Sequence, residues 1–467
     1  MTGALVTLAY LVAASLFILG LKRLASPRTA RAGNRMAAIG MLIGVVAALV
    51  SEQILNPVEL AGGLLVGGAI GVALARRTAL TEMPELVAAF NGFGGAASAL
   101  VAAAEVVTLA ERGGPLDALS ALVVGLSVLI GGVTLTGSFL ALGKLRGSVR
   151  STGFPGLRLV SIVVGLATLV ALGAMAASGT ADAAVPALAA LAALSLVLGV
   201  LLVLPIGGAD MPVVVALLNA YSGLAAAATG FVLGNYALVI AGALVGASGL
   251  ILTRIMCEAM NRSLSNVLLG GFGAEAGGAA AGGDGEALPV RATTPDDLAV
   301  MMAYAGRVVI VPGYGLAVAQ AQHEARELAD LLQKEGVQVS YAIHPVAGRM
   351  PGHMNVLLAE ANVPYDQLIE MDEINPAFAQ TDVVLVVGAN DVVNPGARDD
   401  PDSPIYGMPV LNVDEAQQVI VMKRSMSTGY AGIQNPLFFL DNTAMLFGDA
   451  KASLKAIVGE LKALETA

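Results

Sequence analysis

The sequence has few charged residues, few aromatic residues and almost no cysteine. Of its 467 residues, 13% are charged, 4% are aromatic and 56% are hydrophobic. An average soluble domain has about a quarter charged residues, which excludes a soluble fold for most of this chain. The one cysteine, Cys257, excludes an internal disulfide and fits a reducing compartment. The length exceeds that of a single core, so two or more domains are expected.

Histidine and clustered basic residues are also scarce. All three histidines, His323, His344 and His353, lie in the second half of the chain, and their spacing matches no metal site. Residues 1–262 contain 14 Lys and Arg against 10 Asp and Glu, whereas the remainder contains 11 against 25. An acidic C-terminal half excludes nucleic acid as a partner, because nucleic-acid binding requires clustered cations.

Long apolar segments fill the first 262 residues. A helix that crosses a bilayer needs about 20 mostly apolar residues. The N-terminal segment has neither a basic start nor a cleavage pattern, so we interpret it as a retained helix. Frequent glycine and alanine predict a tightly packed bundle. The nine predicted transmembrane helices are residues 3–21, 35–51, 57–75, 84–110, 116–142, 157–178, 183–206, 211–233 and 236–260.

Basic residues mark one end of these helices. They follow the first, third, fifth and ninth predicted helices, and only Arg112 lies at the opposite end. The positive-inside rule therefore places the N-terminus outside and the C-terminal domain in the cytoplasm.

The bundle contains an internal repeat. An acid followed by Met-Pro, at Glu82 and again at Asp210, precedes the fourth and the eighth helix. An asparagine follows nine residues after each acid, at Asn91 and Asn219. The paired helices lie four apart in the chain, so both copies have the same orientation.

The repeated asparagines lie at matching depth, because nine residues of helix reach about 13 Å into the membrane. Ser138 also aligns with a serine in the second copy, and Asp210 lies near the cytoplasmic end. These residues either form hydrogen bonds that hold a duplicated scaffold together or provide a polar track for a proton or small ion. The candidate proton path is Asn91, Ser138, Asp210 and Asn219.

Residues 263–289 are rich in glycine and alanine without a periodic pattern, which predicts a flexible linker. Residues 290–467 alternate strand-like and helix-like segments, as in a parallel sheet covered on both faces. Strands are predicted at 307–312, 337–343, 367–371, 383–388, 408–413 and 418–422, and helices at 316–335, 352–362, 414–417 and 450–464.

A glycine turn follows the first strand of this domain. Residues 313–318 match G-x-G-x-x-(A/V) between a strand and a helix, which predicts a Rossmann-like dinucleotide site. Gly313 makes the turn, Gly315 admits the pyrophosphate, and Val318 takes the position that normally allows close helix packing. The N–H groups at the helix start then face the phosphates.

The acid that usually binds the ribose about 20 residues later is missing. The second strand instead ends before His344 and Pro345. Lys423, Arg424 and Ser425 follow a later strand, where they suit a 2′-phosphate and favour NADP over NAD. The alternative is a solvated basic turn.

Two further segments of the C-terminal domain suggest ligand contacts. Gly388 to Asp391 end another strand, and Asp391 is either a turn residue or helix cap, or a titratable group near the cofactor. His344 and His353 flank Arg349 in a loop rich in glycine and proline, which suggests a loop that faces a ligand. No nucleophile with a Ser/His/Asp set is present, and hydride transfer needs none, because the cofactor supplies that chemistry.

Over nearly its whole length, the sequence resembles the beta subunit of the proton-translocating nicotinamide nucleotide transhydrogenase. The motifs that carry the resemblance are long and occur in the same order. They are residues 210–219 (DMPVVVALLN), 312–322 (PGYGLAVAQAQ), 344–355 (HPVAGRMPGHMN), 388–395 (GANDVVNP), 423–432 (KRSMSTGYAG) and 448–451 (GDAK).

The resemblance implies a transmembrane proton-translocating domain at 1–262 and an NADP(H)-binding domain at 290–467, with the nucleotide in a flipped orientation across the sheet. Residues 423–425 would hold the 2′-phosphate, and residues 429–432 would cover the cofactor. Asp391 would couple protonation to cofactor affinity. The implied cofactor-binding residues are Gly313, Tyr314, Gly315, Ala317, Val318, Arg349, Pro351, Gly352, His353, Met354, Asn355, Gly388, Ala389, Asn390, Asp391, Lys423, Arg424, Ser425, Gly429, Tyr430, Gly448, Asp449 and Ala450.

The resemblance also implies partners. A separate alpha subunit would bind NAD(H) and add further membrane helices, and the assembled complex would be a homodimer among the lipids of a bacterial inner membrane. Many relatives have a histidine where this sequence has Asn91, and no other membrane histidine replaces it. A titrating relay must then use water, Asp210 or a partner's group, and we expect the last.

Two alternatives remain at this stage. A transporter or channel gated by a nucleotide-binding domain would bind the nucleotide as a signal and catalyse no redox reaction. A dehydrogenase anchored to the membrane would need a substrate domain with an acid or base, and the sequence contains no such domain.

Overall fold

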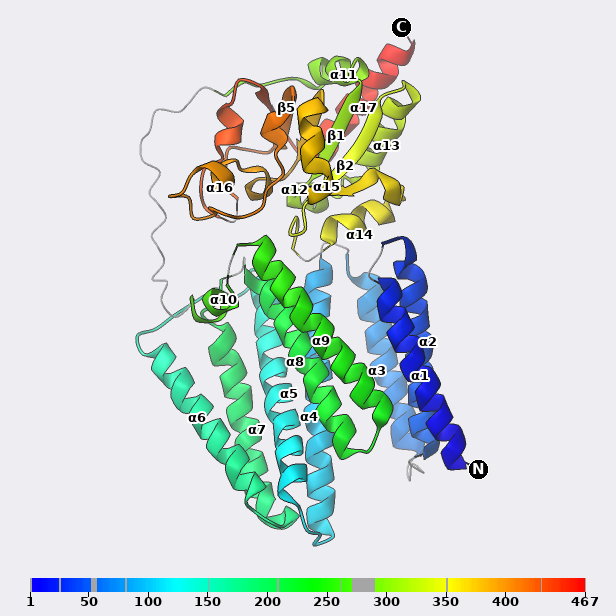
Figure 1. The fold of residues 1–467 in the computed structure, drawn as a ribbon, viewed down its shortest axis with the longest axis vertical. Coiled ribbons are helices and arrows are strands. Elements are labelled where there is room, and N and C mark those ends of the chain that lie inside the picture. The colour runs from blue at the N-terminus through cyan, green and yellow to red at the C-terminus, as the bar shows by residue number, and fades with distance from the viewer. Residues whose placement is uncertain are drawn as a thin grey trace. The chain divides into compact units, whose positions relative to one another are not determined.

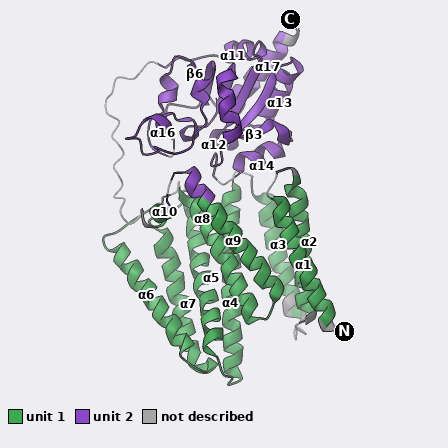
Figure 2. Cartoon of the chain, in the orientation of Figure 1, with its two compact units in different colours: residues 1–254, 264–273 green, residues 255–263, 274–467 purple. Residues whose placement is uncertain are grey.

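A computed structural model of the chain contains two compact units (Figures 1 and 2). The first comprises residues 1–254 and 264–273, and the second comprises 255–263 and 274–467. The predicted linker includes a helix, α10 (Leu264–Gly270), and its remainder, 271–289, lies outside the described residues. The structure describes residues 2–24, 27–51, 57–79, 82–149, 151–207, 210–261, 263–270, 290–349, 352–429 and 431–466.

The long apolar segments form helices close to the predicted bounds, except that α2 begins at Pro27 and not at residue 35. They are α1 (Thr2–Leu24), α2 (Pro27–Ser51), α3 (Pro57–Arg77), α4 (Met83–Glu111), α5 (Ala118–Leu145), α6 (Leu157–Ala176), α7 (Ala181–Val203), α8 (Met211–Val232) and α9 (Tyr236–Ala259). Over their described residues, eight of these helices are long and apolar enough to cross a membrane, which makes the chain a multi-pass membrane protein. The helix α3 is not among the eight, so a bundle of nine spanning helices stays a prediction.

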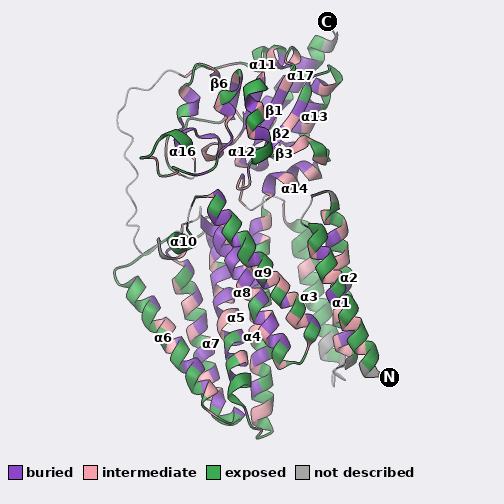
Figure 3. Cartoon of the chain, in the orientation of Figure 1, coloured by how far each residue is buried: buried purple, intermediate pink, exposed green. Residues whose placement is uncertain are grey.

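Helices α5 and α8 form the centre of the first unit. About half of the apolar window of each is buried, 50% for α5 and 56% for α8, against 28% or less for the other six (Figure 3). Glycine brings the helix backbones together, because a Cβ at Gly95 of α4 would lie 2.9 Å from the carbonyl oxygen of Gly131 on α5. Such close approach is how helices associate where no water drives packing.

The internal repeat has matching local geometry in both copies. The residue before α4, Glu82, has φ −97° and ψ 2°, and the residue before α8, Asp210, has φ −88° and ψ −4°. Neither side chain caps its helix, and a proline occupies the first turn of each. Gly223 of α8, which matches Gly95 of α4, likewise faces a glycine of the following helix.

A buried lysine closes the end of α7. The Nζ atom of Lys144 donates to the carbonyl oxygens of Val203 at 2.9 Å and Leu204 at 2.6 Å, and also to that of Ile206. These carbonyls belong to the last residue of α7 and to the residues that follow it, where the helix supplies no further donors. The ammonium therefore adds a charged donor for acceptors at this helix end.

The second unit contains a six-stranded parallel sheet in the order β3-β2-β1-β4-β5-β6. The strands are β1 (Arg307–Pro312), β2 (Gln338–Ile343), β3 (Leu368–Glu370), β4 (Val383–Val387), β5 (Gln418–Lys423) and β6 (Thr443–Phe447). The helices are α11 (Pro295–Ala303), α12 (Tyr314–Val318), α13 (Gln322–Lys334), α14 (His353–Glu360), α15 (Met371–Ile374), α16 (Gly396–Asp399) and α17 (Ala450–Thr466). Short 3₁₀ turns are η3 (Tyr365–Gln367), η4 (Asn375–Gln380), η5 (Asp391–Val393), η6 (Val413–Glu415) and η7 (Pro436–Phe439).

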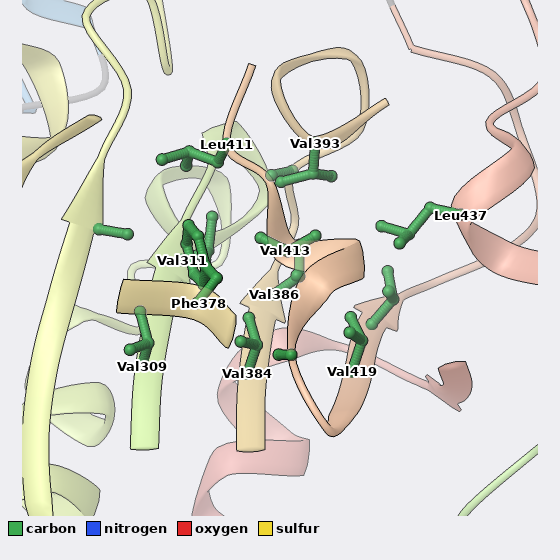
Figure 4. Packing of buried hydrophobic residues seen from close by; sticks show 14 of the residues in the cluster. Val309, Val311, Phe378, Val384, Val386, Val393, Leu411, Val413, Val419 and Leu437 are labelled. Carbon is green, nitrogen blue, oxygen red and sulfur yellow. The ribbon is translucent and has the colours of Figure 1, made fainter. Parts of the chain in front are cut away.

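Alternate residues of the central strands build a core on each face of the sheet. On one face, Val309, Val384 and Val419 lie in register against Phe378 of η4 (Figure 4). On the other face, the hydroxyl of Tyr341 donates to the carbonyl of Ala325 in α13 at 3.1 Å. Strands that are buried on both faces explain why their sequences are continuously apolar.

The prediction of a strand at 408–413 is wrong. The backbone of this segment binds side chains and loops instead of a strand, since Asn375 donates to the carbonyl of Val410 and Leu411 donates to that of Val392. Leu411 is buried in the core, which explains the strand-like hydrophobicity. The sixth strand is β6, which the sequence did not indicate.

Two helix predictions are also corrected. The segment 316–335 is not one helix, because α12 ends at Val318 and α13 begins only at Gln322. Between them, Gln320 has φ 50°. Ala321 and Gln320 donate to the carbonyls of Leu316 and Ala317, the hydrogen-bond pattern of a helix that ends in a left-handed residue. The segment 414–417 forms only the single 3₁₀ turn η6.

A short extended segment covers the outer edge of β6. The N–H of Met445 donates to the carbonyl of Arg291 at 2.7 Å, and that of Thr293 donates to the carbonyl of Met445 at 3.0 Å. Residues 291–293 thereby use backbone groups that an edge strand would otherwise expose.

We expect Phe378→Ala to destabilise the second unit by about 3–5 kcal/mol, because it leaves a cavity under the central strands. Urea-dependent pulse proteolysis of the detergent-solubilised chain measures this change. Phe447→Ala is the control, since Phe447 is 45% exposed, and a change below about 1 kcal/mol is expected there. Equal losses in the two variants would contradict the assignment of Phe378 to the core.

Candidate functional site

The loops singled out in the sequence meet at the carboxyl edge of the sheet. Residues 313–315 follow β1, residues 344–353 follow β2, residues 388–391 follow β4 and residues 423–429 follow β5. The strand order reverses between β1 and β4, and ligands of open parallel sheets bind at this switch point. The candidate site is therefore formed by four loops at and beside this switch point.

Glycines hold the loops after β1 and β4 in direct contact. The N–H groups of Gly313 and Gly315 donate to the carbonyls of Val387 and Gly388, both at 2.9 Å. A Cβ at Gly315 would lie 2.6 Å from the Cα of Gly388, and one at Gly313 would lie 2.5 Å from that of Ala389. Gly388 itself has φ +66°, which favours glycine. No side chain fits between these two loops.

This contact changes the interpretation of the glycine motif. The space that Gly315 leaves open is occupied by Gly388, so its missing side chain allows the two loops to pack. The N–H groups of Gly315 and Leu316 are already bonded, to Gly388 and Gly313, and so are not available for a phosphate. Val318 is 46% exposed and does not mediate close helix packing, whereas Ala317 is buried.

The loop after β2 positions Arg349 beside the glycine turn. The guanidinium carbon of Arg349 lies 4.6 Å from the centre of the Tyr314 ring, a cation–π distance. The N–H of Arg349 donates to Nδ1 of His353 at 3.1 Å. His353 is buried at the start of α14, and its Nε2 has no partner among the described residues. A neutral His353 thus holds the backbone from which Arg349 extends.

His344 also requires the neutral state. Its Nδ1 accepts from the N–H of Val346 at 3.2 Å, and its Nε2 lies 2.8 Å from the carbonyl of Pro409. Burial lowers the pKa of His344 to about 4. Burial, and secondarily the charge of Arg349, lowers the pKa of His353 to about 4 as well. Both rings act as hydrogen-bonding parts of the loop framework.

Asp391 joins the loop after β4 to the loop after β5. Its Oδ2 accepts from the N–H of Ala431 at 3.0 Å, and Gly429 packs directly on the carboxylate. Asn435 donates to the carbonyl of Asn390 at 3.0 Å and fixes the same two segments further along. These contacts join two loops and do not decide between the two roles predicted for Asp391.

At the end of β5, Lys423 is held inward, and the two residues that follow the strand point outward. Lys423 donates to the carbonyl of Ser427 at 2.7 Å, and its Nζ lies 4.6 Å from the centre of the Phe438 ring. Burial lowers the pKa of Lys423, and the charge of Asp391 opposes that shift. Arg424 and Ser425 are exposed. Arg424 makes no hydrogen bond or ion pair with the residues that the structure describes, so its charge is available to a ligand.

The remaining predicted positions lie after β6, at the start of α14 or outside the described residues. Asp449 accepts at Oδ1 from the N–H groups of Lys451 and Ala452, both at 3.1 Å, and so caps α17. Gly448 lies at the end of β6 and Ala450 begins α17. Pro351 and Tyr430 lie outside the described residues. Gly352, Met354 and Asn355 belong to the start of α14, and a side-chain oxygen of Asn355 is buried without a partner among the described residues.

In the bundle, the structure joins two of the four predicted proton-path residues. Asn91 of α4 donates from Nδ2 to the hydroxyl of Ser138 on α5 at 3.0 Å. Ser222 of α8 donates to Oδ1 of Asn91 at 2.6 Å. Asn219 lies one turn before Ser222 and makes no side-chain hydrogen bond within the described part of the chain, and Asp210 is 8% exposed just before α8.

Sequence reasoning missed Ser222. It was visible as part of the repeat, where the first copy has Gly94 at the matching position, but its hydroxyl was not counted as a partner of Asn91. The difference between the copies was the available signal.

Comparison with known proteins assigns the chain to a family. A family model described as "NAD(P) transhydrogenase beta subunit" matches residues 6–460. The chain belongs to this family. Two relatives from Rhodospirillum rubrum, both named NAD(P) transhydrogenase subunit beta, are each 51% identical over 462 residues, which cover 98% of this chain and 99% of the relative. As a transhydrogenase beta subunit, it is a component of an oxidoreductase.

We expect the stability of the second unit to fall as the pH falls from about 6.5 to about 4. The unfolded chain protonates His344 and His353 first, because their pKa in the fold is lowered to about 4. Above pH 6.5 the two histidines therefore leave the free energy of unfolding unchanged. Between pH 6.5 and 4 that free energy falls, by at most about 3 kcal/mol per histidine. Pulse proteolysis at several pH values measures this loss.

His353→Asn separates the contribution of one ring. An asparagine oxygen can accept from the N–H of Arg349 but does not titrate, so the loss of stability on acidification should become smaller. His323→Asn is the control, because the side chain of His323 is 57% exposed. A pH dependence in His353→Asn equal to that of the unsubstituted protein would show that His353 is not held neutral.

Proposed function

We propose that this chain binds NADP(H) at the carboxyl edge of its sheet, and that its membrane domain couples nucleotide binding to proton translocation. NAD(H) would bind to a partner alpha subunit, and direct hydride transfer between the two nucleotides would supply the redox chemistry. The same proposal includes a membrane domain at 1–262, a linker at 263–289 and a nucleotide-binding domain at 290–467. It also includes a homodimeric complex in a bacterial inner membrane, with the C-terminal domain in the cytoplasm. The Lys and Arg residues that gather at one end of the predicted membrane helices support that orientation.

The observation that carries this proposal is a cation without a partner among the described residues, next to a hydroxyl, at the carboxyl edge of the sheet. Arg424 and Ser425 are exposed after β5, beside a Lys423 that is held inward. A guanidinium binds a phosphate with two parallel hydrogen bonds, which suits the 2′-phosphate that distinguishes NADP from NAD. Buried polar atoms of His353 and Asn355 have no hydrogen-bond partner among the described residues. A bound nucleotide would provide such partners.

Binding and proton movement are coupled through loop contacts of Asp391 in this proposal. Its carboxylate binds Ala431 and touches Gly429 in the loop that would cover the nucleotide. Protonation would weaken the charge-assisted hydrogen bond and release that loop, which changes the affinity for NADP(H). One charge that moves through about 150 mV provides about 3.5 kcal/mol, enough to shift an equilibrium by more than two decades.

We expect Arg424→Gln to weaken NADP(H) binding by about ten- to a hundredfold, the range for loss of a charge-assisted hydrogen bond. Binding of NAD(H) at the same site, which lacks the 2′-phosphate, should change little. Isothermal titration of the detergent-solubilised chain measures both affinities. Lys334→Gln is the matched control, because Lys334 is exposed at the end of α13, away from the carboxyl edge. Equal weakening for both nucleotides would contradict a 2′-phosphate contact.

The function itself is tested with the assembled complex in proteoliposomes. After addition of an NAD-binding alpha subunit, hydride should pass from NADPH to an NAD analogue, with a pH change across the membrane that an uncoupler abolishes. Asp391→Asn should retain the fold and lose most of the dependence of NADP(H) affinity on pH. A nucleotide-dependent ion flux without hydride transfer would instead support a gated transporter or channel.

A further inference from the structure

A second polar cluster lies in the bundle beside the one that contains Asn91. The hydroxyls of Ser127 on α5 and Thr229 on α8 lie 2.7 Å apart, and both residues are buried. Each hydroxyl also lies within hydrogen-bond distance of the carbonyl oxygens of Ser98 on α4 and Ala225 on α8, at 3.0 to 3.3 Å. The cluster thus uses the same three helices as Asn91, Ser138 and Ser222.

The hydrogen bonds of this cluster can be arranged in two equivalent ways. Each hydroxyl has one proton and can both donate and accept. Either Ser127 donates to Thr229, which donates to a carbonyl, or Thr229 donates to Ser127, which donates to a carbonyl. A group that relays protons needs such a pair of states, because each passage reverses the direction of the hydrogen bonds.

The two clusters form layers at different depths of the membrane. On α4 the step from Asn91 to Ser98 is seven residues, and on α8 the step from Ser222 to Thr229 is also seven, so the layers are about 10 Å apart along the helices. That distance is far longer than a hydrogen bond. A proton cannot pass directly from one layer to the other.

Thr134 lies between the two layers. It is fully buried on α5, one turn from Ser138 and two turns from Ser127. A Cβ added at Gly95, the α4 residue one turn beyond Asn91, would lie 2.9 Å from the Cβ of Thr134. Its hydroxyl has no partner among the described residues. A buried hydroxyl without a partner costs about 1–3 kcal/mol, and a bound water removes that cost.

The hydroxyl of Ser138 also has an unused proton. It accepts from Asn91, and within the described residues no group accepts its own proton. Ser138 and Thr134 therefore present two unfulfilled hydrogen-bonding positions one helical turn apart on the same face of α5. Water is the small molecule that can donate to one and accept from the other.

We propose that Thr134 and bound water connect the Asn91 cluster to the Ser127–Thr229 pair and so continue the proton path through the bundle. In each step, an oxygen accepts a proton from the neighbouring water as its own O–H proton leaves to the next oxygen, so no hydroxyl changes its net charge. This assignment rests on the proposed proton-translocating function. It adds Thr134, Ser127, Thr229 and Ser222 to the path predicted from sequence.

Thr134→Val tests the connection, because it replaces the hydroxyl with a methyl group of similar size. The complete complex with its alpha subunit is placed in proteoliposomes, and the initial rate of nucleotide-driven proton translocation is followed with a pH-sensitive dye. We expect a decrease of about tenfold, equivalent to about 1.4 kcal/mol in the barrier. NADP⁺ affinity in detergent should stay unchanged, and Thr134→Ser should restore translocation.

Thr168→Val is the matched control, since Thr168 is buried on α6 and donates to the carbonyl of Val164 at 2.7 Å, away from both clusters. It should translocate protons at the unsubstituted rate. If Thr134→Val does not assemble, Thr229→Val removes the far end of the path and should show the same loss.

Wild-type translocation in Thr134→Val would overturn the connection while leaving the pump intact, and a raised thermal stability in that variant would identify Thr134 as a dry hydroxyl. Absence of translocation in the unsubstituted complex would instead refute the proposed function.

Discussion

The contact between two backbone turns organises the second unit. Gly315 and Gly388 approach so closely that neither position has room for a side chain. Their contact joins the loops after β1 and β4, the two neighbouring strands from which the sheet extends in opposite directions. The loops after β2 and β5 then attach to this pair, through Arg349 on Tyr314 and through Asp391 on the 429–431 segment. The loops after β1, β2, β4 and β5 are thereby held together at that junction.

A different constraint governs the bundle, because lipid offers its polar groups no hydrogen bonds. Most of its buried polar side chains pair with each other or with backbone carbonyls, as Lys144 does at the end of α7 and as Asn91 does with Ser138 and Ser222. Such pairing is required in hydrocarbon, so a hydrogen bond alone does not identify a path. Thr134 differs because its hydroxyl is buried and has no partner among the described residues.

The apolar segments and the parallel sheet could be predicted from sequence because their patterns are long. Strands buried on both faces give continuous apolar stretches, and β1, β2, β4 and β5 were located within a residue or two. The segment 408–413 was misassigned because burial of Leu411 and Val413 in the core gives the same pattern without strand pairing. The centre of β6 is Ala444, Met445 and Leu446, which favour strands less than the valines of β4 do, so its own sequence contains little signal.

The candidate site was only partly predictable. Motif spacing located the loops, but it could not show that Gly315 faces Gly388 or that Asp449 caps a helix, because both depend on neighbours that are distant in sequence or on backbone geometry. Ser127 and Thr134 lie on α5 and Thr229 lies on α8, so they come together only when α4, α5 and α8 pack. Isolated hydroxyls in an apolar helix are common, and their sequence context does not distinguish them.

The covered edge of β6 limits how other proteins can bind to the second unit. Residues 291–293 use the backbone groups of that edge, and the opposite edge is β3, which is only three residues long. Strand addition at either edge would therefore gain few backbone hydrogen bonds. This limit favours contacts through side chains and loops wherever another protein binds the second unit.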